Sequence, residues 1–159
     1  MVEFRQFEAS EFDAYKDKST KEYAQDLIRS KRSKRRKALR DSVKEFDSIL
    51  PQGIATANHS INHVMNEQGE AVGFLWFGID GKDVFVYDFW INENQQRKGF
   101  GKQTLEKLEQ IAAVQEMETI TLHVFDFNAV AYALYESVGY KVISTEPGGC
   151  YMQKRIVAL

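Results

Sequence analysis

Residues 84–115 read VFVYDFWINENQQRKGFGKQTLEKLEQIAAVQ and predict a strand, a glycine-containing loop and a helix, in that order. The first eight residues are apolar or aromatic except for Asp88, which is typical of a strand buried on both faces. After a polar break that contains Gly99 and Gly101, apolar side chains recur at the spacing of one helical face. These side chains are Leu105, Leu108, Ile111 and Ala112. The strand is expected to lie at the centre of a sheet.

The loop has the composition of an anion-binding site. The first amides of a helix lack intrahelical partners, and this end of the helix carries a partial positive charge. Gly99 and Gly101 have no Cβ atom to keep a phosphate away from the backbone, and Arg97, Lys98 and Lys102 add positive charge. The sequence therefore predicts a pyrophosphate site here. A tight turn from strand to helix also requires glycine, so a purely structural role for the glycines stays open.

Two familiar phosphate-binding motifs are excluded by the residues beside these glycines. A P-loop needs Lys and then Ser or Thr after its last glycine, but Lys102 is followed by Gln103. A Rossmann fingerprint needs a third glycine where this chain has Thr104.

Residues 96–101, with the sequence QRKGFG, instead resemble the Q/R-x-x-G-x-G/A acetyl-CoA loop of the GNAT superfamily of N-acetyltransferases. Residues 128–140, NAVAYALYESVGY, are similar to the N-x-x-A-x-x-L-Y-x-x-x-G-F/Y segment of that superfamily, at the expected distance beyond the loop. The resemblance spans roughly residues 72–140. It implies a bacterial-type member with one domain over residues 1–159. The implied fold class is α/β (α+β), with a mixed, mainly antiparallel central sheet of about six to seven strands and about four helices on its two faces.

Length and composition are those of one globular domain. The 159 residues are 43% hydrophobic and 28% charged, which is enough apolar material for a core. A net charge of −2 argues against general attraction to nucleic acid, and no apolar run approaches the roughly 18 residues of a membrane span. The chain does not open with a signal-peptide pattern, and its one cysteine, Cys150, cannot form an internal disulfide. We therefore expect a cytoplasmic protein.

The amino-terminal residues predict a strand followed by helical structure. Val2, Phe4 and Phe7 suggest a half-buried strand by their near alternation with polar residues. Ser10 is a candidate helix N-cap, and Ser19–Thr20 would interrupt the helix, so one broken helix or two short ones are expected.

A second helix carries Leu39, Val43, Phe46, Ile49 and Leu50 on one side and ends at residues 51–53. Antiparallel strands are predicted at residues 61–65, 71–79 and 84–91, because turn residues separate them. An alternating strand at 119–125 and a helix at 128–138 follow, and Gly139 is predicted to end this helix. Residues 140–144 and 151–156 would be the closing strands.

Residues 29–40, RSKRSKRRKALR, contain eight basic residues and no acidic one. Because the whole chain carries −2, the residues outside this run carry −10. Such a run is most often a solvated helix surface. A second interpretation is a cationic rim at the acceptor entrance, which would favour an acidic peptide or a phosphate-bearing metabolite by salt-sensitive steering.

The resemblance implies transfer of an acetyl group from acetyl-CoA to a primary amine by direct attack, with no metal. It also implies that Tyr135 protonates the departing thiolate, because a tyrosine with a pKa of about 10 is protonated at neutral pH. Asn128 and Tyr135 share a helical face. In the alternative interpretation, neither contacts a cofactor: Asn128 only caps the helix and Tyr135 packs in the core. The implied cofactor-binding residues are Phe89, Trp90, Ile91, Gln96, Arg97, Lys98, Gly99, Phe100, Gly101, Lys102, Asn128 and Tyr135.

Asp88 is the candidate general base or amine ligand, because a carboxylate in an apolar strand needs a partner, solvent or a proton. A structural, hydrogen-bonded acid is its alternative role. Some GNAT members carry a glutamate earlier in this strand, where this chain has Phe85. His123 is a further candidate base. His59 and His63 have no cysteine or acidic ligand set nearby, so no zinc site is expected.

An N-acetyltransferase with a small-molecule amine or a peptide as acceptor is therefore the leading function. A non-catalytic CoA-binding regulatory module is an alternative, although it would not need both Asn128 and Tyr135. A nucleic-acid binder using the basic run is disfavoured by the acidic remainder. No membrane partner is expected, and a homodimer is left open.

Overall fold

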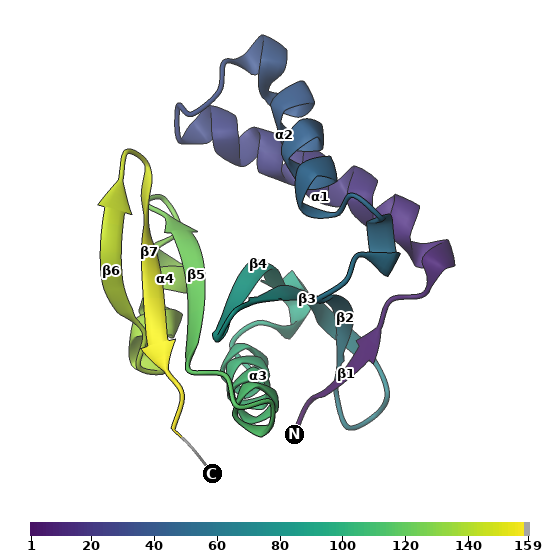
Figure 1. Ribbon diagram of the computed structural model, residues 1–159, viewed down its shortest axis with the longest axis vertical. Coiled ribbons are helices and arrows are strands. Elements are labelled where there is room, and N and C mark those ends of the chain that lie inside the picture. Colours follow the sequence, from purple (N-terminus) through teal and green to yellow (C-terminus); the bar gives the residue numbers. More distant parts are fainter. Residues whose placement is uncertain (158–159) are drawn as a thin grey trace.

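The computed structural model describes residues 1–157, and it contains a seven-stranded sheet with the strand order β1-β2-β3-β4-β5-β7-β6 (Figure 1). Ala158 and Leu159, the end of the domain predicted above, lie outside the described residues. Every neighbouring pair of strands is antiparallel except β4 and β5, which are parallel. The strands are β1 (Glu3–Gln6), β2 (His59–Met65), β3 (Ala71–Asp80), β4 (Asp83–Ile91), β5 (Thr119–Phe125), β6 (Lys141–Glu146) and β7 (Gly149–Arg155).

Four α-helices cover the two faces of this sheet, and the fold class predicted from the sequence is confirmed. Helices α1 (Ala9–Arg29) and α2 (Arg35–Ile49) lie at the top of Figure 1, and α3 (Phe100–Val114) lies below them. Helix α4 (Ala129–Ser137) follows β5. Two 3-10 turns, η1 (Gly53–Ala55) and η2 (Glu93–Gln95), complete the described elements.

Alternation along the strands sends apolar side chains into two separate cores. On the α3 and α4 side, Val84 and Val86 of β4 pack with the buried residues of β5 and with Leu108 of α3. On the α1 and α2 side, Trp76 packs in a smaller cluster with Tyr15. That cluster also contains Phe7, Phe46, Leu50 and Ile61. Strand β3 is thus buried along most of its length. The prediction that residues 84–91 are buried on both faces is wrong, since Val84, Val86 and Ile91 of β4 are buried but Tyr87 and Trp90 are 37% and 41% exposed.

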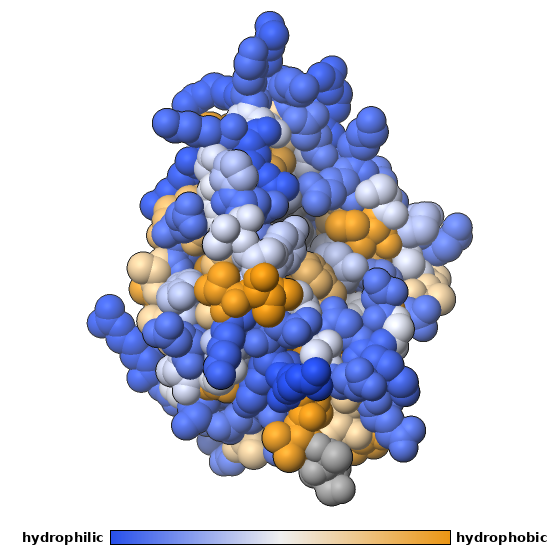
Figure 2. Space-filling model, turned by 60° about the vertical axis from the view of Figure 1, so that its left-hand side comes forward, coloured by the Kyte–Doolittle hydropathy of each residue, from blue (hydrophilic) through white to orange (hydrophobic). Residues whose placement is uncertain are grey.

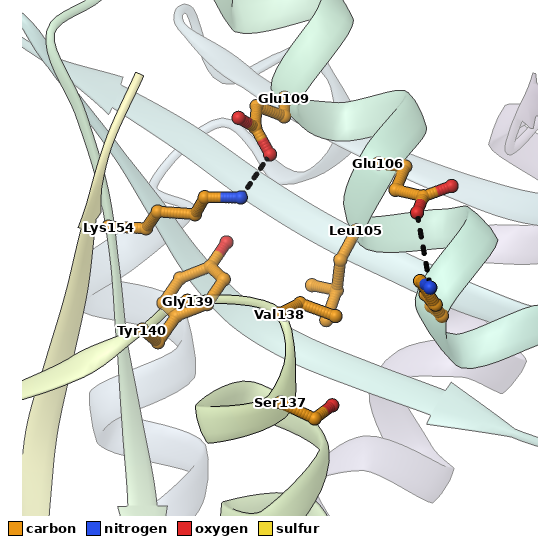
Figure 3. Close-up of a pocket in the computed structure, with 9 residues that line it drawn as sticks. Leu105, Glu106, Glu109, Ser137, Val138, Gly139, Tyr140 and Lys154 are labelled. Carbon is orange, nitrogen blue, oxygen red and sulfur yellow. Dashed lines mark hydrogen bonds and ion pairs between the residues drawn. The ribbon is translucent and has the colours of Figure 1, made fainter. Parts of the chain in front are cut away.

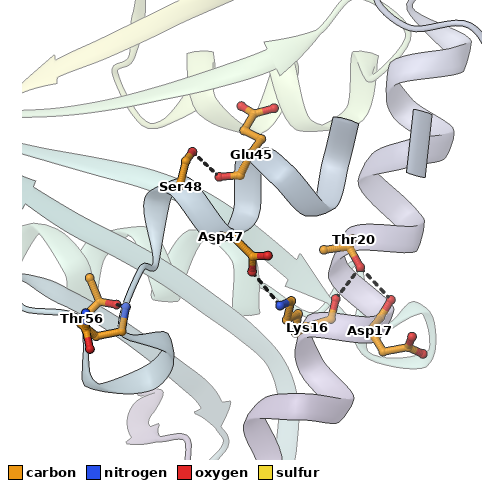
Figure 4. A network of polar contacts seen from close by, with 8 residues as sticks. Lys16, Asp17, Thr20, Glu45, Asp47, Ser48 and Thr56 are labelled. Carbon is orange, nitrogen blue, oxygen red and sulfur yellow. Dashed lines mark hydrogen bonds and ion pairs between the residues drawn. The ribbon is translucent and has the colours of Figure 1, made fainter. Parts of the chain in front are cut away.

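Helix α1 is continuous, so the predicted interruption at Ser19–Thr20 is wrong. The Thr20 hydroxyl is satisfied inside the helix, since it donates to the carbonyl of Lys16 over 2.7 Å, and the polar side chain therefore does not break the helix (Figure 4). Ser10 is not the N-cap either. The helix begins after Glu8, which forms a reciprocal capping box with Glu11.

Helix α2 packs against α1 through small residues as well as through the predicted large ones. Ala38, Ser42 and Phe46 are its buried residues, whereas Leu39 is 47% exposed, contrary to its predicted place on the apolar side. The Ser42 hydroxyl donates to the carbonyl of Thr20 over 2.7 Å, which ties the two helices together in their buried contact. At the surface of the same contact, Lys16 and Asp47 form an ion pair of 2.6 Å (Figure 4). No helix within residues 1–157 is both long and apolar enough to span a membrane.

The parallel pair β4 and β5 separates halfway along its length. Asp83 to Val86 pair with Thr119 to Leu122, and no pairing continues beyond Val86. A β-bulge starts at this point, because Phe77 of β3 lies opposite Val86 while Trp76 lies opposite Asp88, which leaves Tyr87 as the extra residue. The second half of β4 therefore has a free edge towards β5. This gap positions the candidate site.

Candidate active site

The glycine loop lies between the end of β4 and the start of α3. Gly99 is the N-cap of α3 and has φ 87°, in the left-handed region that favours glycine. Gln96 folds back, and its side-chain Nε2 donates to the Ile91 carbonyl over 2.8 Å. Gln96 thus fixes the loop to the strand end in this structure. Arg97 and Lys98 are exposed and make no ion pair among residues 1–157.

The other predicted cofactor-binding residues divide between the apolar core and the surface. Phe89 and Phe100 pack against the core on the α3 side, and Ile91 is buried. Trp90 is 41% exposed at the end of β4. Lys102 lies in the first turn of α3 and approaches Glu106 at 3.9 Å. A Cβ atom on Gly101 would lie 3.0 Å from Cδ2 of Leu134, so this glycine permits close packing of α3 on α4.

Helix α4 carries Asn128 and Tyr135 at two different depths. Asn128 is exposed, and its Oδ1 accepts from the amide of Ala131 over 3.2 Å, so it caps the helix. Tyr135 is 7% exposed, and burial together with the charge of Asp88 raises its pKa well above the ordinary value. The hydroxyl therefore stays protonated far above neutral pH.

Asp88 is largely buried and hydrogen-bonded to the first helix. Its Oδ2 accepts from the Tyr15 hydroxyl at 2.6 Å and from the Ser19 hydroxyl at 3.3 Å. Burial raises the pKa of Asp88 to about 6, the charge of Glu22 adds to this effect, and the two hydroxyl donors oppose it. Asp88 is therefore mostly ionised at pH 7 and protonated at pH 5.

Asp26 is a further acid of this site that the sequence reasoning missed. Burial, followed by the charges of Asp88 and Glu22, raises its pKa to about 6. Tyr15, Ser19, Glu22 and Asp26 follow one another by three or four residues, so they lie on one face of α1. That polar stripe could have been read from the sequence, but nothing there indicated that it faces β4.

Aromatic side chains line the same side of the sheet around these acids. Trp76 and Tyr87 stack with ring centroids 4.8 Å apart. On the β5 side, Phe125 packs against Phe127 at 5.1 Å and approaches Tyr23 of α1 at 6.4 Å. The region between α1 and the separated strands thus combines acidic groups with aromatic walls.

The three histidines have local partners. Nε2 of His123 lies 2.9 Å from a carboxylate oxygen of Glu146, and burial is the main cause that lowers the pKa of His123. Trp76 Nε1 donates to His59 Nδ1 over 3.1 Å, and His63 approaches Glu11 at 2.8 Å. Within residues 1–157, no three or more His, Cys, Asp or Glu side chains are arranged to hold a metal ion.

A hollow of about 340 Å³ lies between α3, the end of α4 and β7, and none of the acids just described lines it (Figure 3). Its charged side chains are matched in pairs, since Lys154 contacts Glu109 at 2.7 Å and Lys102 approaches Glu106. The Tyr140 hydroxyl is buried there without a protein partner among the described residues. The paired charges leave this hollow nearly neutral.

Comparison with known proteins decides the family. A model described as "Acetyltransferase (GNAT) family" matches residues 13–140. This chain belongs to the GNAT acetyltransferase family. The superfamily membership predicted from the loop and the α4 segment is therefore confirmed.

Similar members of the GNAT family come from Bacillus subtilis strain 168. The uncharacterized N-acetyltransferase YdgE is 31% identical over 134 residues, which cover 82% of this chain and 85% of YdgE. YycN, also named an uncharacterized N-acetyltransferase, is 30% identical over 138 residues, which cover 84% of this chain and 88% of YycN. The crystal structure of Bacillus subtilis YycN aligns with a TM-score of 0.87 at 28% identity and covers 92% of this chain and 96% of that one. These relatives support an acyltransferase activity for this GNAT protein.

A more distant GNAT structure shares the fold alone. Spermidine N-acetyltransferase from Vibrio cholerae, in complex with CoA and spermine, aligns with a TM-score of 0.67 at 16% identity. The match covers 98% of this chain and 95% of that one.

Replacing Gly99 by Val tests the predicted cofactor loop of this GNAT protein. We expect the Kd for acetyl-CoA, measured by calorimetry, to rise at least tenfold, which is about 1.4 kcal/mol. The φ of 87° does not suit a β-branched residue, and the new side chain would cover the first amides of α3. Gly69→Val is the matched control, because Gly69 also has a positive φ, 78°, and open space around it. Equal affinity in folded Gly99→Val and wild type would contradict a cofactor role for this loop.

Proposed function

We propose that this protein is an N-acetyltransferase that transfers the acetyl group of acetyl-CoA to a primary amine by direct attack. The observation that carries the proposal is the free edge of β4 beyond Val86, which runs directly into the glycine loop at the N-terminus of α3. The charge of Asp88 on β4 reaches the hydroxyl of Tyr135 on α4, since it contributes to the raised pKa of that tyrosine. One group is ionised at neutral pH and the other is protonated, as acid–base catalysis of this transfer requires.

The residues at the gap fit a CoA thioester. The positive φ of Gly99 leaves the N-terminus of α3 accessible to a pyrophosphate, with Arg97 and Lys98 beside it. The free edge of β4 after Val86 has backbone groups for the amides of a pantetheine arm. Asn128 uses its Oδ1 as a helix cap, so its side-chain NH₂ group is left to donate to the same arm. When bound, acetyl-CoA supplies an acyl carbon that is activated as a thioester.

The acceptor first loses its ammonium proton to solvent, and the transfer then needs two proton movements. The amine nitrogen forms a C–N bond with the acyl carbon while the C–S bond breaks. Asp88 accepts the proton that the nitrogen loses, directly or through one water molecule, because a nitrogen that has bonded to a carbonyl carbon becomes strongly acidic. Tyr135 donates its hydroxyl proton to the departing sulfur, and the two residues then return to their starting states through solvent.

The charges in the site favour a cationic acceptor. Asp26 and Glu22 lie within electrostatic reach of Asp88. Lys18 approaches Glu22 at 4.0 Å and Arg29 acts on Asp26, but the three acids still outnumber these two cations, so this face of α1 is negative where an amine would enter. An ammonium group gains from this potential, whereas a carboxylate or phosphate at the same place is repelled. If the basic run at residues 29–40 attracts acidic acceptors, as the sequence predicts, it does so outside the acidic region around Asp88.

An acceptor screen tests the proposed function. Primary amines, diamines, acidic amines and peptides are each incubated with acetyl-CoA, and release of the CoA thiol is followed. We expect turnover with at least one amine class, and lower KM values for acceptors that carry a second cationic group than for acidic ones. Binding of acetyl-CoA without release of the CoA thiol in the presence of any of these acceptors would instead favour the non-catalytic regulatory module.

A further inference from the structure

The turn between α1 and α2 encloses a second hollow, which has no residue in common with the acetyl-transfer site. It has a volume of about 530 Å³ and is lined by Ile28, Lys31, Arg32, Ser33, Lys34, Arg36, Lys37 and Asp41. Figure 2 shows hydrophilic side chains over the top of the molecule, where this turn lies in Figure 1. We call it the basic hollow. Its size is within the range of small-molecule sites, roughly 300–1,000 Å³.

The basic hollow carries an uncompensated positive charge. Five of its lining residues are cationic and one, Asp41, is acidic. Of the five cations, Arg32 alone makes an ion pair within residues 1–157, with Glu146 at 3.4 Å. Asp41 accepts from the Ser33 hydroxyl at 2.9 Å. About three positive charges therefore remain unmatched, in contrast to the paired lysines of the hollow beside α3.

This charge arrangement is unfavourable for the protein by itself. Like charges around one small hollow repel, and the positive end of the α2 dipole adds to the repulsion. Helix α2 has no acidic residue in its first turn, and its N-cap Lys34 makes no side-chain capping bond. An anion with several negative charges would remove the repulsion.

The turn that holds these side chains is fixed to the end of α1. The amides of Arg32 and Ser33 both donate to the carbonyl of Leu27, at 2.9 and 3.1 Å. Arg29 stacks on the ring of Phe127, with 4.1 Å from its guanidinium carbon to the ring centroid. The backbone of the turn is therefore held by the end of α1, and it brings the five cationic residues together around one hollow.

We propose that the basic hollow binds a small anion with two or three phosphate groups, separately from the acetyl-transfer site. Guanidinium and ammonium groups are the usual protein partners of phosphate, and three unmatched charges suit a di- or triphosphate. Ile28 is the only apolar lining residue, so no hydrocarbon chain is accommodated. A long nucleic acid is disfavoured, since the residues outside the basic run carry −10.

Calorimetric titration with inorganic tripolyphosphate tests this proposal on the full chain. The variant Lys34→Ser/Arg36→Ser/Lys37→Ser should bind tripolyphosphate at least tenfold more weakly than wild type. All three residues are exposed, and serine at position 34 is a better helix N-cap than lysine, so the fold should be retained. Lys21→Ser/Lys44→Ser/Lys141→Ser is the matched control with the same loss of charge outside the hollow, and it should bind within about twofold of wild type.

A second variant separates the basic hollow from the cofactor loop, which also attracts phosphate. Arg97→Ser/Lys98→Ser should keep the tripolyphosphate affinity of wild type. Loss of binding in this variant, or an equal loss in the lysine control, would overturn the proposal. It would also be overturned if wild type ignored tripolyphosphate and bound a poly-glutamate peptide through the same three residues, because the occupant would then be an acidic protein.

Discussion

Tyr135→Phe is expected to lower kcat by roughly 10²-fold or more while the Kd for acetyl-CoA stays within about twofold of wild type. Phenylalanine keeps the ring that packs against Tyr140, at 5.9 Å between centroids, and removes the proton that we propose is donated to the departing sulfur. Burial and the charge of Asp88 hold this proton on the hydroxyl in the wild type. Steady-state rates of thiol release and calorimetric binding of acetyl-CoA together check the prediction.

The matched control for this change is Tyr132→Phe. Tyr132 lies three residues earlier on α4 and is half-buried, so its hydroxyl can be removed with a similar change in packing. The control should keep kcat within about twofold. A Tyr135→Phe enzyme that is as fast as Tyr132→Phe would show that water or another group protonates the thiolate.

Asp88→Asn is expected to lower kcat by about 10²- to 10³-fold above pH 7, because asparagine cannot accept the amine proton. The pKa of Asp88, about 6, also predicts the shape of the wild-type profile. The rate should fall as the pH drops through about 6, since protonated Asp88 is no longer a base. Rates measured from pH 5 to 9 with a saturating acceptor test both effects, and a profile of unchanged shape in the variant would contradict the assignment. Asp80→Asn, at an exposed strand end, is the control.

The same substitution should alter the pH dependence of stability. The pKa of Asp88 is about 6 in the folded protein, against about 3.9 for an unfolded aspartate. Between these pH values the folded state binds more protons, so the free energy of unfolding falls as pH rises through this window. Asp88→Asn removes this decrease in the free energy of unfolding, because asparagine does not titrate. Urea unfolding should therefore show the variant gaining about 2 kcal/mol relative to wild type between pH 4 and pH 7.5. If variant and wild type differed by the same free energy of unfolding at both pH values, the pKa of Asp88 would not be raised in the folded protein.

The glycine loop before α3 and the order of elements could be predicted from the sequence because both depend on local chemistry. Apolar alternation places β4 and β5, the hairpin residues between β3 and β4 make the turn, and Gly99 permits a positive φ that other residues avoid. The two segments that resemble the GNAT superfamily, residues 96–101 and 128–140, are likewise defined by residues close together in the sequence. Capping is local too. The cap at Asn128 is the alternative role that the sequence offered for this residue, whereas the cap predicted at Ser10 is wrong, because Glu8 and Glu11 cap α1 together.

Only the tertiary structure decided which polar side chains meet at the candidate site. Asp88 is one acid in an apolar strand, and its burial by α1 brings Tyr15 and Ser19 to its carboxylate across more than 60 residues of sequence. Asp26 becomes part of the site for the same reason. Local periodicity identifies a helix face but does not determine which strand it packs against, because that choice depends on the summed packing of both apolar cores. The raised pKa of Asp88 is likewise a property of burial, which no local sequence pattern determines.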